Sequence, residues 1–190
     1  MDTYSIAIWI WNGVEELDFA GPYEVLTSWS RAVAAERQIT VRTVAATTDP
    51  ITCSHGLRVI PDAALDELDH VDLFLHPGGQ TGSLVADEAW LQRVRDIQTS
   101  GALMTSVCNG AVVYGAAGLL EGRPATTHWG SVSALRDLGI DVDEEARYVD
   151  DGDVVTSAGV SAGIDMALHL VARLESDEVA AQVRRYIQYD

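Results

Sequence analysis

The chain has 190 residues, 47% of them hydrophobic, which suits one compact domain over residues 1–190 and argues against a disordered chain. Its formal net charge is −17, and all twelve basic residues are arginine because the sequence contains no lysine. The acidic balance argues against nucleic acid as a partner, while the missing lysine excludes Schiff-base chemistry and a lysine-type phosphate loop.

Short apolar runs alternate with helix-like segments along the chain. A first strand is predicted over 4–11, followed by a loop that carries Glu16 and Asp18, and then by a helix that begins at Pro22. The further elements are strands at 39–45, 71–76, 102–107 and 124–127, helices at 87–99, 110–117, 131–138, 161–174 and 177–188, and hairpins at 51–60 and 147–157. Strands that alternate with helices predict an α/β fold, with a largely parallel sheet covered by helices on both faces.

Four loops are predicted at one edge of this sheet. They contain Asp18, Pro77-Gly78-Gly79, Cys108 and His128. Ligands of open parallel sheets bind beyond the carboxyl ends of the strands. We therefore expect these loops to meet in space and to bind a small-molecule substrate.

Cys108 follows an apolar strand and precedes a run of small residues that is typical of a helix. The stretch Ser106-Val107-Cys108-Asn109-Gly110 resembles a nucleophile elbow, with serine where glycine usually comes first. Backbone N–H groups at a helix N-terminus favour a negative charge. We therefore expect Cys108 to be a nucleophile whose pKa is lowered.

A reactive cysteine needs a proton carrier, and the sequence leaves three candidates. Asp18 or Glu16 would share one proton with the thiol, because two adjacent negative charges are unfavourable. His128 would instead form a Cys–His pair. Trp129, the next residue, is a candidate for a wall of the pocket.

The glycine-rich loop at 77–82 lacks both the GxGxxG pattern and the lysine of a phosphate loop, so nucleotide binding is not expected. The backbone N–H groups of Gly78 and Gly79, together with that of Asn109, are predicted to form an oxyanion-type hole opposite Cys108.

Neither a metal nor a cofactor is expected. Cys53 and His55 form a Cys-x-His pair, which is too small a ligand set for a metal site, and the other histidines have no metal-ligand spacing. The apolar runs are too short to span a membrane, and the first residues lack the basic region of a signal peptide. We therefore expect a cytoplasmic protein with no membrane partner.

Six stretches of the chain together resemble one protein family. They are Glu16-Leu17-Asp18-Phe19-Ala20-Gly21-Pro22, His76-Pro77-Gly78-Gly79, Thr105-Ser106-Val107-Cys108-Asn109-Gly110, Gly118-Leu119-Leu120-Glu121-Gly122-Arg123, Ala125-Thr126-Thr127-His128-Trp129 and Ser161-Ala162-Gly163-Ile164-Asp165. The set resembles the DJ-1/PfpI superfamily over roughly residues 4–189. Within it, the chain is similar to the isonitrile (isocyanide) hydratases and to the amidotransferase-like domains of AraC-type regulators.

The resemblance implies a flavodoxin-like sandwich of the class I glutamine amidotransferase type, a homodimer, and Cys108 as the nucleophile. It also implies that Asp18 works with the cysteine, and that the N–H groups of Gly79 and Asn109 face the reacting atom. The hydratases usually have threonine where this chain has Asn109. A hydroxyl contact is therefore lost and the shape of the pocket differs.

The expected reaction is attack of the Cys108 thiolate on the terminal carbon of an isocyanide. Asp18 supplies the proton, and water hydrolyses the resulting thioimidate to an N-substituted formamide. Two alternatives remain: a ligand- or redox-sensing domain without turnover, and glyoxalase-like action on α-oxoaldehydes.

Overall fold

A seven-stranded sheet forms the centre of the protein in the computed structural model, which describes residues 3–190. Its strands are β1 (Tyr4–Trp9), β2 (Ile39–Ala45), β5 (Ala63–Ala64), β6 (Leu73–His76), β7 (Leu103–Val107), β10 (Tyr148–Asp150) and β11 (Val154–Ser157). They lie in the order β10-β11-β7-β6-β1-β2-β5, and every neighbouring pair is parallel except β10 and β11. The predicted α/β fold with a largely parallel sheet is confirmed.

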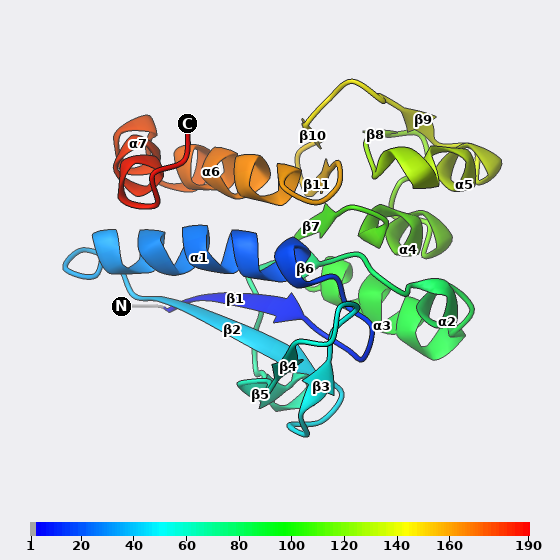
Figure 1. Cartoon of the computed structure of the whole chain (residues 1–190), viewed down its shortest axis with the longest axis horizontal. Coiled ribbons are helices and arrows are strands. Elements are labelled where there is room, and N and C mark those ends of the chain that lie inside the picture. Colours follow the sequence, from blue (N-terminus) through cyan, green and yellow to red (C-terminus); the bar gives the residue numbers. More distant parts are fainter. Residues whose placement is uncertain (1–2) are drawn as a thin grey trace.

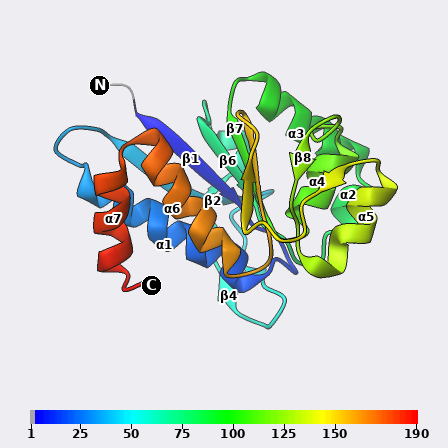
Figure 2. The same cartoon turned by 90° about the horizontal axis from the view of Figure 1, so that it is seen from above.

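Helices cover both faces of the sheet (Figures 1 and 2). On one face lie α1 (Glu16–Ala32), α6 (Ala162–Leu174) and α7 (Asp177–Tyr186); on the other lie α2 (Gly82–Val85), α3 (Glu88–Thr99), α4 (Gly110–Ala116) and α5 (Val132–Asp137). The smaller elements are β3 (Ile51–Thr52) paired with β4 (Arg58–Val59), β8 (Pro124–Ala125) paired with β9 (Asp141–Val142), and the 3₁₀ turns Leu65–Glu67 and Trp129–Ser131.

The first strand shows why the sheet is buried on both sides. Ile6 and Ile8 belong to the apolar core under α1, α6 and α7, whereas Ala7 and Trp9 belong to the core under α3, α4 and α5. Successive side chains of a strand point to opposite faces, so a continuous apolar run suits a strand between two helical layers.

The start of α1 differs from the prediction. The helix begins at Glu16, and Pro22 lies inside it rather than at its first position. Proline lacks an N–H group and so cannot donate a hydrogen bond to the carbonyl of Asp18, but this removes only one bond of the first turns. Packing of the buried face of α1 against the core outweighs that loss. Asp18 therefore lies on the first turn of a helix and not in a loop.

Several other elements are shorter than the sequence predicts. The first strand ends at Trp9, the strand predicted at 124–127 pairs only over Pro124–Ala125, and the last helix ends at Tyr186. The hairpin at 147–157 is confirmed as the antiparallel pair β10–β11. Over residues 3–190, the structure has no helix that is both long enough and apolar enough to cross a membrane.

Candidate active site

The carboxyl ends of three neighbouring strands bring the predicted site residues together. β1, β6 and β7 are adjacent in the sheet, and the chain leaves them toward Asp18, Gly78 and Cys108 respectively. A β-carbon built on Gly78 would lie 2.8 Å from Asp18 Oδ2 and 2.8 Å from the Cys108 β-carbon. Only glycine fits between the carboxylate and the cysteine.

Cys108 occupies a sharp turn between β7 and α4. Its backbone φ is 58°, in the left-handed region that non-glycine residues seldom adopt, as at a nucleophile elbow. The turn is fixed by two hydrogen bonds: the N–H of Cys108 donates to the Ser157 carbonyl at 3.1 Å, and its carbonyl accepts from Thr127 Oγ1 at 2.8 Å. The residue is 8% exposed. Only a small molecule has access to a sulfur atom in such a position.

Asp18 is fully buried beside this cysteine. Its Oδ2 accepts a hydrogen bond from the N–H of Gly78 at 2.9 Å, while its Oδ1 is buried without a hydrogen-bond partner. A buried carboxylate oxygen without a partner costs free energy unless it binds a proton or a ligand. Asp18 is therefore the carboxyl group best placed to exchange a proton with Cys108.

The pKa values of both groups are raised. Burial raises the pKa of Asp18 to about 7, an effect that Glu15 adds to and the Gly78 N–H opposes. Burial, followed by the charge of Asp18, raises the pKa of the Cys108 thiol to about 12, although the Asn109 N–H favours the thiolate. The expected lowering of the Cys108 pKa is wrong, because desolvation and a neighbouring carboxylate outweigh the backbone N–H groups. Above about pH 7 the pair therefore holds one proton, on the thiol, beside the ionised carboxylate of Asp18.

The N–H groups predicted to form an oxyanion-type hole have other partners. That of Gly78 donates to Asp18, and that of Gly79 donates to Oδ1 of Asn109 at 2.8 Å. The Asn109 N–H is the backbone donor that acts on the Cys108 sulfur. The structure therefore places all five predicted residues together, but in a different hydrogen-bond arrangement.

Glu16 lies next to the site but is directed elsewhere. Its carboxylate accepts hydrogen bonds from the His55 and Leu57 N–H groups and lies 2.9 Å from the His55 ring nitrogen Nδ1. Asp18 and Glu15 are the carboxylates that act on the Cys108 thiol. The geometry thus favours Asp18 over Glu16 as proton carrier.

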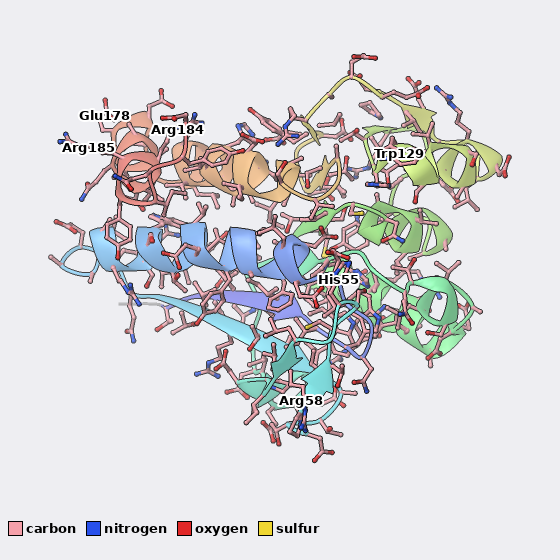
Figure 3. The ribbon with its side chains drawn as sticks, in the orientation of Figure 1. His55, Arg58, Trp129, Glu178, Arg184 and Arg185 are labelled. Carbon is pink, nitrogen blue, oxygen red and sulfur yellow. The ribbon has the colours of Figure 1, made fainter. Side chains whose placement is uncertain are left out.

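Among the described residues, no hydrogen bond or charge effect links His128 or Trp129 to the Cys108 sulfur. Nδ1 of His128 accepts from the Gly130 N–H at 3.1 Å and so caps its own turn. Trp129, labelled in Figure 3, is 83% exposed. Its ring lies against that of His128. In the single chain Trp129 therefore encloses no pocket, and its predicted place in a pocket wall stays a prediction.

His55, labelled in Figure 3, lies close to two carboxylates. Its Nδ1 lies 3.4 Å from Glu15 and 2.9 Å from Glu16, and the three side chains offer ligand atoms within 4.8 Å of one another. The sequence suggested only Cys53 as a neighbour of His55, because the glutamates are about forty residues away in the chain. Glu16 hydrogen-bonds to His55, and Glu15 lies at ion-pair distance from the same ring nitrogen.

His76 lies next to the site, although the sequence pattern did not indicate a functional role for it. It is fully buried at the end of β6, where Nδ1 lies 2.8 Å from the Pro77 carbonyl and Nε2 accepts from the Trp90 indole at 3.3 Å. These two contacts require a neutral ring. Its position just before the glycine loop makes it a support for Gly78.

Protonation of His76 is expected to weaken the fold. Burial lowers the pKa of His76 from 6.5 to about 4, so between these pH values the unfolded chain binds a proton that the folded chain does not. Stability is therefore retained above pH 6.5 and lost as the pH falls to about 4, by on the order of 3 kcal/mol. The measurement is urea unfolding at pH 7.5 and pH 5, comparing wild type with His76→Gln. The loss in free energy of unfolding between pH 7.5 and pH 5 should shrink in His76→Gln but persist in His70→Gln, the control in which an exposed histidine is replaced. An equal loss in all three proteins would contradict the prediction.

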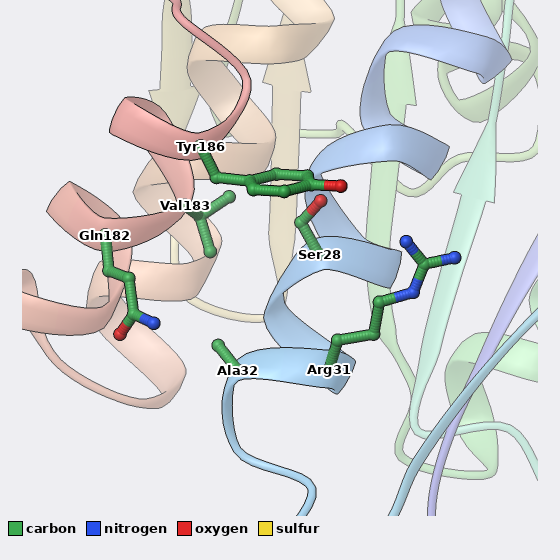
Figure 4. Close-up of a pocket in the computed structure, with 6 residues that line it drawn as sticks. All are labelled: Ser28, Arg31, Ala32, Gln182, Val183 and Tyr186. Atoms are coloured by element: carbon green, nitrogen blue, oxygen red, sulfur yellow. The ribbon is translucent and has the colours of Figure 1, made fainter.

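A separate cavity of about 250 Å³ lies between α1 and α7 (Figure 4). Ser28, Ala32, Val183 and Tyr186 are among its lining residues. Ser28 is ten residues beyond Asp18 on the same helix, which corresponds to about 15 Å. This cavity is therefore not part of the site around Cys108.

Comparison with known proteins agrees with the fold. A sequence model of the DJ-1/PfpI family matches residues 4–173. The isonitrile hydratase of Pseudomonas putida is 37% identical over 177 residues, covering 93% of this chain and 74% of the relative. The HTH-type transcriptional regulator CdhR of Pseudomonas aeruginosa is 34% identical over 136 residues, covering 70% of this chain but 40% of the regulator.

A solved structure resembles the whole chain. The crystal structure of a ThiJ/PfpI family protein from Pseudomonas syringae is 33% identical, with a TM-score of 0.87, and the match covers 100% of this chain and 76% of that one. The family match extends over most of the chain and includes the elbow cysteine, the glycine loop and the buried aspartate. The chain therefore belongs to the DJ-1/PfpI family.

Proposed function

We propose that the protein is a cysteine-dependent enzyme that hydrates a small isocyanide to an N-substituted formamide. The observation that carries this is the buried pair of Cys108 and Asp18, in which the raised pKa values keep the thiol protonated beside a carboxylate that ionises near pH 7. The similarity to an isonitrile hydratase over 93% of the chain supports the choice of substrate class.

The first step adds the thiol to the isocyanide carbon. As the Cys108 Sγ–C bond forms, the carboxylate of Asp18 takes the thiol proton and delivers it to the same carbon, which gives a thioimidate. This needs an ionised Asp18 beside a protonated thiol, which is the state that the two pKa directions favour above about pH 7.

The second step consumes one water molecule. Its oxygen bonds to the thioimidate carbon, and Asp18 moves one of its protons to the nitrogen. The C–S bond then breaks, the hydroxyl proton returns through Asp18 to the sulfur, and the N-substituted formamide is released. Atoms balance as isocyanide plus water, and the enzyme returns to its starting state.

A second candidate function is ligand or redox sensing without turnover. The similarity to the regulator CdhR over 70% of this chain favours it. Oxidation of Cys108 to a sulfinate in a protein that turns over no electrophile would support this reading. We also propose, from the family, that the chain forms a homodimer in the cytoplasm, which analytical ultracentrifugation and cell fractionation would test.

The experiment that tests the proposed function compares two electrophiles. The purified protein is incubated with a small alkyl isocyanide at pH 8, and formamide is followed by NMR; a parallel sample receives methylglyoxal, with lactate as the readout. Formamide without lactate supports the hydratase. Lactate alone identifies a glyoxalase, and the absence of both products favours the sensing function.

A further inference from the structure

The side chain of Asn109 has an unusual set of partners. The residue lies at the N-cap of α4, where asparagine commonly accepts a hydrogen bond from the first turn of its helix. Here the carboxamide makes no such bond and is directed to the glycine loop instead. The first turn of α4 therefore lacks a side-chain cap, and the carboxamide is available to bind the glycine loop.

The Asn109 side chain hydrogen-bonds to both the backbone N–H and the backbone carbonyl of Gly79. Its Oδ1 accepts from the Gly79 N–H at 2.8 Å, and its Nδ2 donates to the Gly79 carbonyl at 2.9 Å. Asparagine can form both bonds because its side chain carries a donor and an acceptor, whereas the single hydroxyl of threonine cannot replace the pair.

Gly79 is also fixed from its other side. It forms an isolated antiparallel bridge with Val14, and a β-carbon at Gly79 would lie 2.3 Å from the Gly13 carbonyl oxygen. The φ of Gly79 is +128°, a conformation that favours glycine. Packed between the Gly13–Glu15 segment and Asn109, the Gly79 N–H is held away from any substrate.

We propose that Asn109 determines the reaction specificity of the site by occupying the Gly79 N–H, so that isocyanides react at Cys108 and carbonyl electrophiles react poorly. This inference rests on the proposed function. It makes Asn109 a positioning residue that acts through Gly79 rather than a group that touches the reacting atoms.

The chemistry of the two substrate classes explains the selection. Addition of a thiol to an α-oxoaldehyde places negative charge on the carbonyl oxygen, and enzymes stabilise such an oxygen with preorganised N–H donors. Addition to an isocyanide carbon develops no oxyanion, because the proton from the thiol goes to that carbon. With the Gly78 and Gly79 N–H groups occupied, the Asn109 N–H near the sulfur is left for the substrate. This arrangement suits the isocyanide.

The test releases the Gly79 N–H by Asn109→Ala, which removes the acceptor that Gly79 binds. The matched control is Asn12→Ala, which removes a carboxamide that binds the Thr52 N–H at 2.8 Å on the protein surface. Asn109→Ala is expected to raise the ratio of kcat/KM for methylglyoxal to that for isocyanide by up to about 10²-fold, the lower end of the contribution of one oxyanion-hole donor. Asn12→Ala should keep the wild-type ratio.

A binding measurement makes the outcome independent of turnover. Methylglyoxal forms a hemithioacetal, in which a Cys108 S–C bond forms and the thiol proton passes to the oxygen, and this protects the thiol from iodoacetamide. Asn109→Ala should be protected at about tenfold lower methylglyoxal concentration than wild type. A parallel loss of both activities, or unchanged protection, overturns the inference. Wild type without formamide production would refute the proposed function alone, since protection still decides the role of Asn109.

Discussion

Replacing Cys108 with alanine is expected to abolish formamide production, with a loss in kcat of at least about 10⁴-fold, as for other enzymes that lose their nucleophile. The variant lacks the sulfur that bonds to the isocyanide carbon, so no covalent intermediate can form. The fold should survive, because alanine removes one atom from a small buried side chain at a cost of about 1 kcal/mol, or a few degrees in Tm. The measurement is NMR detection of formamide beside a thermal melt.

Cys53→Ala is the matched control for this prediction. Cys53 is the second free cysteine, is 4% exposed, and has a pKa raised to about 11 by burial and then by Glu16 and Glu15. It shares burial and a raised pKa with Cys108 but lies on the β3–β4 hairpin and not at the elbow. Formamide production should stay within about twofold of wild type. An active Cys108→Ala protein, or an inactive but folded Cys53→Ala protein, would refute the assignment.

Asp18→Asn is expected to reduce kcat by about 10²- to 10⁴-fold, the usual contribution of a positioned acid or base. Asparagine retains an oxygen to accept from the Gly78 N–H but cannot take the thiol proton. Wild-type activity should rise as the pH increases through about 7, the pKa of Asp18, because the carboxylate acts as the base. This rise should be absent in Asp18→Asn. The pH profile of kcat/KM is the measurement.

The same substitution is expected to stabilise the protein at alkaline pH. Because the pKa of Asp18 is raised in the folded state, the contribution of Asp18 to stability is greatest below the ordinary aspartate pKa of 3.8 and falls as the pH rises to about 7. Asp18→Asn avoids this loss. At pH 8 its free energy of unfolding should be about 1 to 3 kcal/mol higher than that of wild type, and this gain should disappear toward pH 4.

Glu16→Gln is the control that separates the two carboxylates. Its partners are His55 and Leu57, so its removal should leave both the pH profile of activity and kcat close to wild type. If Glu16→Gln loses the rise in activity near pH 7 and Asp18→Asn retains it, the proton carrier is Glu16 and the proposed mechanism is refuted.

Several features of the fold and site were predictable because they depend on local pattern. The apolar run from Tyr4 to Trp9 and the strand before Cys108 have the composition of buried parallel strands, and their alternation with helices requires crossover connections. Parallel strands direct their carboxyl ends to one edge. The convergence of Asp18, Gly78 and Cys108 followed from that rule without knowledge of any distance.

The start of α1 shows where local pattern misled. Pro22 is a good first helical residue by its fixed φ, and three acidic residues before it suggested a solvated loop. The helix begins at Glu16 because the face that carries Phe19, Val25 and Leu26 is buried against the core. Burial of that face depends on residues distant in sequence, so no window of the chain contains the information.

By itself the sequence determined the order of strands and helices along the chain, the elbow at Cys108 and the core of the set of residues that meet around it. Only the tertiary structure decided their surroundings. It places Asp18 rather than Glu16 beside Cys108, raises rather than lowers the pKa of Cys108, and pairs the Gly79 N–H with Asn109. The physical reason is that burial, charge proximity and hydrogen-bond partners depend on side chains brought together across gaps such as the 60 residues between Asp18 and Gly78.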